Sequence, residues 1–176
     1  SSVGRWSLTF ITTSVPPTAT TFAVNSTADV QDSLPGNGVC QTTTPGECTL
    51  RAAITEANAL PGDDTINLSS GTFLITLMPA GEDNNAGGDF DIRSNITING
   101  TVSTVVQAAG TGGIGVDRIF HFVTPGISAS VSRVNIRNGR APSGTGGGGV
   151  LVETGAAVLL DRVNVSSLQA AYGGAI

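Results

Sequence analysis

Four carboxylates lie close together in the segment GEDNNAGGDFDI, which spans residues 81–92. They are Glu82, Asp83, Asp89 and Asp91, and the glycines between them favour a loop. Because Ca²⁺ is bound by hard oxygen ligands, such a loop is a candidate calcium site. The spacing lacks the order of an EF-hand, and acidic loops are commonly solvated without an ion. A solvated loop without a cofactor is therefore the favoured interpretation, and calcium is the alternative.

A second group that could do chemistry is Asp117 and Arg118 with His121, the chain's single histidine. An arginine, a carboxylate and an imidazole can together perform general acid–base catalysis. The pair Asp117-Arg118 stands directly before the apolar run IFHFV, which is typical of a corner that leads into a strand. We therefore interpret the pair as structural and expect the histidine to be packed or to lie at a strand edge. No catalytic residue is predicted.

Four arginines cluster in the last part of the chain, namely Arg133, Arg137, Arg140 and Arg162. Arg133 and Arg162 are 29 positions apart, and Arg137 lies between them. If the chain repeats with that period, Arg133 and Arg162 stack and could hold an acidic polysaccharide by bidentate contacts. The alternative is that they pair with Asp161 or Glu153 at the surface, where ion pairs contribute little stability.

The composition excludes several classes of function. All 8 basic residues are arginines, so no P-loop lysine and no Schiff-base lysine can exist in this chain. A single histidine cannot form a two-histidine zinc site. The formal net charge of −5 argues against nucleic-acid binding, which needs a basic surface. No apolar run reaches the roughly 20 residues of a transmembrane helix.

The two cysteines, Cys40 and Cys48, are separated by a segment rich in Thr, Pro and Gly. Such a segment can turn and bring the two thiols within bridging distance. We predict a Cys40–Cys48 disulfide, which indicates an oxidising compartment; two reduced thiols are the alternative.

The N-terminal segment 1–21 is predicted to hold one strand and a linker. Trp6, Leu8 and Phe10 alternate with polar residues, which is the pattern of a strand with one apolar face. The following Pro- and Thr-rich stretch favours an extended spacer. The apolar face needs a partner, either on the same chain or on a neighbouring molecule.

The segment 22–68 is predicted to form a cap that contains the disulfide and a helix at about 50–59. Thr49 is a suitable N-cap, and Pro61-Gly62 ends the helix. Apolar residues fall at i, i+3, i+4 and i+7, namely Leu50, Ala53, Ile54 and Ala57. Because a helix of this length is marginal alone, we expect it to pack on the rest of the fold.

From residue 69 to 176 the pattern changes to short strands separated by Gly, Asn and Pro. Val134-Asn135-Ile136 and Val163-Asn164-Val165 recur 29 positions apart, and Ile96-Thr97-Ile98 shares their apolar–polar–apolar core. A recurrence of 26–30 residues with about three strands per repeat is typical of one coil of a parallel β-helix. The coils are expected to be open at the C-terminal end.

Several segments also resemble a known family. CTLRAAITEANALPG, preceded by GNGVC and followed by DTINL, resembles the cap of secreted bacterial proteins with the CSLREA motif. GDFDIRSNITING, DRIFHF, VNIRNG and YGGAI resemble the right-handed β-helix repeats of that group and of polymorphic outer-membrane and choice-of-anchor proteins. Ala52 departs from the motif, which usually has Glu there, so an Arg–Glu interaction beside Arg51 is absent. The resemblance implies secretion, a capped β-helix and surface display, but no reaction.

The predicted fold is therefore an all-β, right-handed parallel β-helix with an N-terminal cap. The predicted function is that of a secreted or cell-surface, non-catalytic structural module for display or adhesion. A head-to-tail filament, with Trp6, Leu8 and Phe10 as its assembly strand, is the expected mode of self-association. The alternative function is a β-helix protein that binds or cleaves polysaccharide. The expected partners are a second copy of the chain, cell-surface components or polysaccharide.

Overall fold

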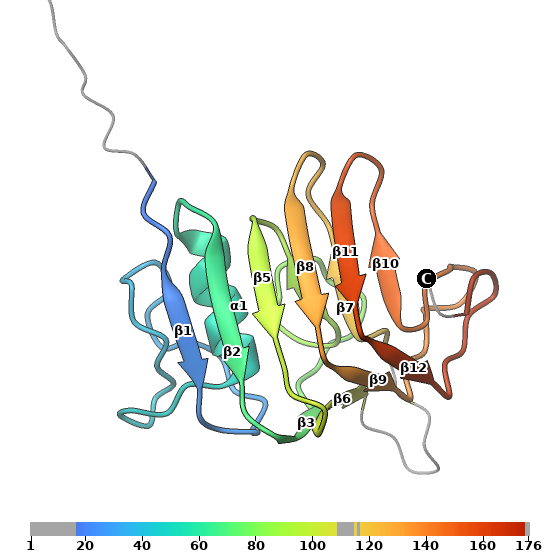
Figure 1. The fold of residues 1–176 in the computed structure, drawn as a ribbon. Coiled ribbons are helices and arrows are strands. Elements are labelled where there is room, and N and C mark those ends of the chain that lie inside the picture. The colour runs from blue at the N-terminus through green and yellow to red at the C-terminus, as the bar shows by residue number, and fades with distance from the viewer. Residues whose placement is uncertain (1–16, 109–114, 116, 175–176) are drawn as a thin grey trace, which may run out of the picture.

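The computed structural model describes residues 17–108, 115 and 117–174, which form parallel strands and a helix (Figure 1). The first sheet has the order β1-β2-β5-β8-β11, and its strands are Thr21–Val24, Asp64–Leu68, Ile96–Asn99, Ser128–Ser132 and Ala157–Asp161. The second has the order β3-β6-β9-β12, with strands Gly71–Ile75, Thr104–Ala108, Asn135–Arg137 and Asn164–Ser166. The third has the order β4-β7-β10, with strands Phe90–Ile92, Phe120–Phe122 and Val150–Val152.

Each of the complete coils, β2–β4, β5–β7 and β8–β10, contributes one strand to each sheet, so that equivalent positions stack in columns. Ile66 pairs with Ile98 and Ile98 with Val131 in the first sheet, and all three side chains are buried. Phe90 pairs with Phe120 in the third sheet, and the centroids of their rings lie 5.8 Å apart. The predicted right-handed parallel β-helix is confirmed as the fold class.

The predicted recurrence is correct in the last coils and wrong in one earlier alignment. Asn135 pairs with Asn164 across β9 and β12, which are 29 positions apart as expected. Ile96–Ile98, however, belongs to the first sheet, where Ile98 pairs with Val131. The alignment fails because every strand of a β-helix has the same apolar–polar alternation, so a three-residue pattern cannot identify the sheet.

The predicted helix is α1 (Leu50–Ala59), which contacts β1, β2 and β4. The Thr49 side chain accepts a hydrogen bond from the Ala52 amide at 3.1 Å, as an N-cap should. The apolar residues predicted to pack are all buried: Leu50, Ala53, Ile54 and Ala57. In Figure 1, α1 lies behind β2, which it contacts.

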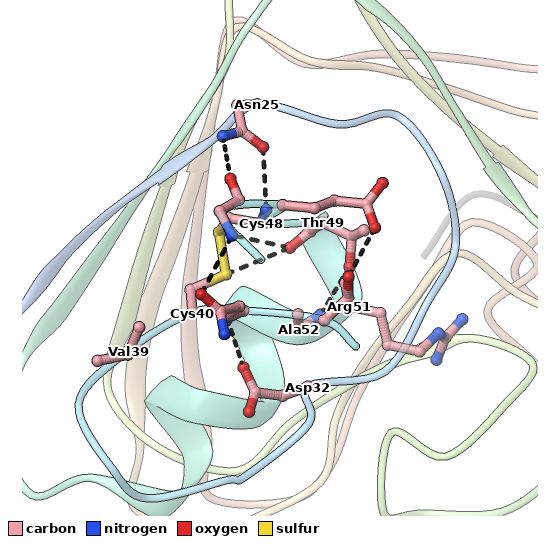
Figure 2. The surroundings of a disulfide bond; sticks show 12 residues. Asn25, Asp32, Val39, Cys40, Cys48, Thr49, Arg51 and Ala52 are labelled. Carbon is pink, nitrogen blue, oxygen red and sulfur yellow. Dashed lines mark hydrogen bonds between the residues drawn. A yellow bond between two sulfur atoms is a disulfide. The ribbon is translucent and has the colours of Figure 1, made fainter. Parts of the chain in front are cut away.

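The predicted disulfide is confirmed: Cys40 and Cys48 are bonded, with their Cα atoms 5.2 Å apart (Figure 2). The surrounding loop is fixed to β1 by Asn25, whose side-chain oxygen accepts the Cys48 amide at 2.9 Å. Asp32 accepts the Gln41 amide at 2.9 Å on the other side of the loop. The disulfide thus holds the chain that leads into the helix.

The side chain of Arg51 is fully buried and joins α1 to two distant segments. It forms an ion pair with Asp29 and lies over the Phe90 ring, 4.6 Å from the centroid. It also donates to the carbonyl oxygens of Gly88 at 2.7 Å and Asp89 at 3.2 Å. The CSLREA motif usually has Glu at the position of Ala52. In this chain Asp29 supplies the carboxylate that pairs with Arg51.

We expect the substitution Arg51→Met to lower the free energy of unfolding by about 3–5 kcal/mol, because it leaves the Asp29 carboxylate buried without its cation. Urea denaturation measures this change. Arg93→Met is the matched control, since Arg93 is exposed, and it should cost under about 0.5 kcal/mol. A cost for Arg51→Met as small as that of the control would contradict the role assigned to this ion pair.

Candidate functional site

Two neighbouring strands of the third sheet place Asp91 and His121 side by side on its outer face. The register pairs Asp91 of β4 directly with His121 of β7. The residues on either side of them belong to the hydrophobic core: Phe90, Ile92, Phe120 and Phe122. Alternation along the strands therefore directs the carboxylate and the imidazole outward. Both are nevertheless buried, because the loop between β3 and β4 covers them.

Glu82 shapes this covering loop from within. Its carboxylate accepts hydrogen bonds from the backbone amides of Asn84, Ala86 and Gly87, at 2.6–2.8 Å. Its oxygens therefore bind the loop's own backbone, and they do not share a site with the other three predicted calcium ligands.

Asn85 attaches the same loop to the cap and to the sheet. Its backbone amide donates to Asp91 Oδ2 at 2.8 Å. Its side-chain amide donates to the carbonyl oxygen of Arg51 at 3.0 Å and to the Thr55 hydroxyl at 2.8 Å. Asn85 is buried and has a φ of 60°, a left-handed conformation that Asn tolerates better than most residues. The position of the loop over Asp91 thus depends on the cap helix.

Three carboxylates surround the imidazole of His121. Its Nδ1 lies 3.3 Å from Asp91 Oδ1 and 3.4 Å from Asp83 Oδ1, and its Nε2 lies 3.1 Å from Glu153 Oε1. Burial raises the pKa of Asp91. Burial lowers the pKa of His121, but its contacts with the Asp91 and Glu153 carboxylates outweigh that effect, and the net direction is upward.

Asp89, Asp117 and Arg118, which come from the two predicted groups, form a second buried cluster close to Asp91 and His121. Arg118 Nη1 lies 3.3 Å from Asp89 Oδ2, and Asp117 accepts the backbone amides of Gly81 and Arg118 at 2.8 and 2.9 Å. Burial, with the Asp117 and Asp91 carboxylates nearby, raises the pKa of Asp89 to about 8 despite the opposing charge of Arg118. This cluster joins the covering loop to the corner before β7.

The predicted arginine ladder lies at the corner between the first and second sheets. Arg133 and Arg162 line one surface pocket with Val102, Asn135 and Asn164, and the cavity has a volume of about 360 Å³. We call this pocket the arginine groove. Arg133 and Arg162 have the same φ of 53°, so the corner conformation repeats from coil to coil. Arg162 pairs with Asp161 at 2.7 Å, as the alternative interpretation expected.

The sequence-predicted residues are thus only partly brought together. Asp83 and Asp91 of the acidic loop meet His121 of the second group, a combination that the sequence analysis did not predict. Arg137 lies in β9, outside the lining of the arginine groove. The role of Glu153 beside the imidazole was also missed. A signal for the central pair existed, since Asp91 and His121 are 30 positions apart, which is one coil.

The covering loop offers a test in two of its glycines, Gly88 and Gly81, which both have a positive φ. A Cβ on Gly88 would clash with Asp117 Oδ2 and would lie 2.9 Å from Ala80 Cα, whereas a Cβ on Gly81 would meet nothing within 4 Å. We expect Gly81→Ala to cost about 1 kcal/mol of stability, the price of the left-handed conformation. Gly88→Ala should cost about 1–3 kcal/mol more because of the clash. Thermal denaturation of both variants measures the difference, and equal costs would contradict the packing of the loop against Asp117.

No helix in the described part of the chain is long and apolar enough to cross a membrane. Comparison with family models found no match, and comparisons with curated proteins and with solved structures found no significant similarity. The resemblance to the CSLREA-motif group therefore stays a prediction.

Proposed function

We propose that this chain is an extracellular, non-catalytic β-helix module whose arginine groove binds acidic carbohydrate. The observation that carries the proposal is the stacking of Arg133 and Arg162 in one pocket. Parallel strands of adjacent coils are about 4.8 Å apart, so two guanidinium groups can meet carboxylates on neighbouring sugars. Guanidinium groups bind carboxylates in a bidentate manner.

The other residues of the groove suit a sugar chain. The side chains of Asn135 and Asn164 hydrogen-bond each other at 3.0 Å, which stacks two amides beside the two arginines. Amides can bond to hydroxyl groups, and Val102, which is 87% exposed, offers an apolar contact for a ring face. Within the described residues, the Arg133 side chain has no ion pair, so its charge is available to a ligand.

Two further observations support an extracellular and non-catalytic role. The Cys40–Cys48 disulfide is typical of proteins in oxidising compartments. The residues that resemble an acid–base group, Asp117, Arg118 and His121, are each at most 5% exposed, where a polymer cannot reach them. A polysaccharide lyase or hydrolase would need such groups in an open groove.

We expect Arg133→Ala and Arg162→Ala each to weaken binding of a polyuronate by roughly tenfold or more, because each removes a charge-assisted contact. Arg93→Ala is the control, since it removes an exposed arginine elsewhere on the surface. Isothermal titration with a polyuronate and with a neutral glucan of similar length measures the effect. Binding to the polyuronate should also weaken as salt is raised.

Two results would contradict this proposal in different ways. Equal binding of the polyuronate by the wild type and by both groove variants would show that the arginine groove is not the binding site. Release of unsaturated or reducing ends from the polyuronate, abolished by Arg118→Ala, would show that the chain is an enzyme.

Self-association through the predicted N-terminal strand is a second candidate function. Among the described residues, β11 is paired on one side only, and the inward side chains Val158 and Leu160 are only half-buried. A strand from another molecule could pair with this edge and cover them. The predicted assembly strand with Trp6, Leu8 and Phe10 lies outside the described residues. We keep it as the proposed donor.

We expect deletion of residues 1–15 to abolish polymers of the full chain and to leave the β-helix folded. Sedimentation velocity over a range of concentrations measures assembly, and circular dichroism checks the fold. Replacing Trp6, Leu8 and Phe10 together by Asp should have the same effect, because it removes the apolar face without shortening the chain. A full chain that is monomeric at every concentration, or a truncated chain that still polymerises, would disprove the assembly.

A further inference from the structure

Three ligand atoms converge beneath the covering loop. Asp83, Asp91 and His121 each offer one ligand atom, and these three atoms all lie within 4.8 Å of one another. The Asp91 side chain is fully buried and that of His121 is 6% exposed. Within the described residues, neither Asp91 Oδ1 nor His121 Nδ1 has a hydrogen-bond partner. Unpartnered polar atoms at such depth are costly, which indicates that something else occupies the space between them.

Glu153 determines which nitrogen of His121 is available. A carboxylate only accepts hydrogen bonds, so the 3.1 Å contact with Glu153 Oε1 requires a proton on Nε2. In the neutral imidazole, Nδ1 then carries a lone pair that faces the Asp83 and Asp91 oxygens. Three electron-rich atoms so close together repel one another unless a cation lies between them. A histidine that donates its other N–H to a carboxylate is also the usual arrangement of a metal ligand.

We propose that Asp83, Asp91 and His121 bind a divalent transition-metal ion of the zinc class. The distances of 3.3 and 3.4 Å from His121 Nδ1 to the two carboxylates suit this ion. Two ligand atoms that are each about 2.1 Å from one metal lie about 3.0–3.4 Å apart in octahedral or tetrahedral geometry.

The donor set favours such a metal over calcium. Ca²⁺ prefers oxygen ligands throughout, whereas an imidazole nitrogen suits zinc and its neighbours in the first transition series. Glu82, the remaining carboxylate of the acidic loop, is bonded to backbone amides instead. The Asp83 side chain is 65% exposed, so water can reach the site and complete the coordination.

The site is built from successive coils and is separate from the arginine groove. Asp91 comes from β4, His121 from β7 and Glu153 from the residue after β10. Asp83 is contributed by the loop that Asn85 and Arg51 hold against the cap helix. The proposal therefore does not rest on carbohydrate binding, and either one can fail without the other.

The test is a titration of the full, chelator-treated chain with ZnCl₂, followed by calorimetry and by ¹⁵N NMR of the imidazole. His121 is the only histidine, so the imidazole signals need no assignment to a residue, and the different couplings of Nδ1 and Nε2 to the ring protons distinguish the two nitrogens. We expect one Zn²⁺ per chain, a changed resonance for Nδ1 and a retained proton on Nε2. Asp83→Asn and His121→Gln should each weaken Zn²⁺ binding at least tenfold, and Glu153→Gln about 10–100-fold.

Asp63→Asn, which alters an exposed carboxylate elsewhere, is the control and should bind Zn²⁺ like the wild type. Asp83 is exposed, so its variant is expected to fold, and circular dichroism verifies this. The proposal is overturned if Zn²⁺ does not bind or if His121→Gln binds it equally well. It is also overturned if Ca²⁺ binds as tightly without a change at Nδ1. If both ring nitrogens of His121 carry protons in the presence of Zn²⁺, the positive charge between these side chains is a proton and not a metal ion, and the proposal is also overturned.

Discussion

The buried guanidinium of Arg51 is the interaction on which the rest of the site depends. A fully buried charge must be neutralised and hydrogen-bonded. The guanidinium of Arg51 is fully buried, and its partners come from three parts of the chain. Asp29 comes from the segment after β1, Gly88 and Asp89 from the end of the covering loop, and Phe90 from the first coil. The cap, the loop and the first coil are therefore fixed by one side chain. Its requirement for acceptors places the loop over the third sheet.

The β-helix itself supplies the other constraint, because each coil repeats the outward and inward directions of the one before. Asp91 and His121 occupy one outward column, and Arg133 and Arg162 occupy one corner. In both cases residues about 30 positions apart become neighbours at the spacing of hydrogen-bonded strands. A solenoid thus forms clusters of like or complementary side chains by register alone, without any local motif in the sequence.

This difference explains what could be predicted from the sequence. The helix and the disulfide depend on residues within about ten positions, and Thr49, Leu50 and Cys40 carry their signals locally. The stacking of Arg133 on Arg162 followed from the period. The position of the covering loop could not be predicted, because it comes from tertiary contacts of Asn85 with the cap and the sheet and not from a local signal.

The ion pair of Arg51 with Asp29 was missed for the same reason, since nothing in the local pattern marks a partner 22 positions away. The corner residues present a related difficulty. Left-handed backbone is usually assigned to Gly or Asn, yet at Arg133 and Arg162 it falls on arginine. At these corners the chain adopts left-handed backbone even though arginine disfavours that conformation.

Four buried carboxylates in this part of the fold are compensated in different ways. Asp29 is neutralised by Arg51, and Asp117 is held by two backbone amides. Asp89 has a pKa raised to about 8, so at neutral pH a proton removes its charge and with it the repulsion from its neighbours. Asp91 differs from these three. One of its oxygens accepts the Asn85 amide, and the other faces His121 Nδ1 without a hydrogen bond. Of the four carboxylates, Asp91 is the one whose unpartnered oxygen faces an imidazole nitrogen, and this juxtaposition is the observation on which the proposed metal site rests.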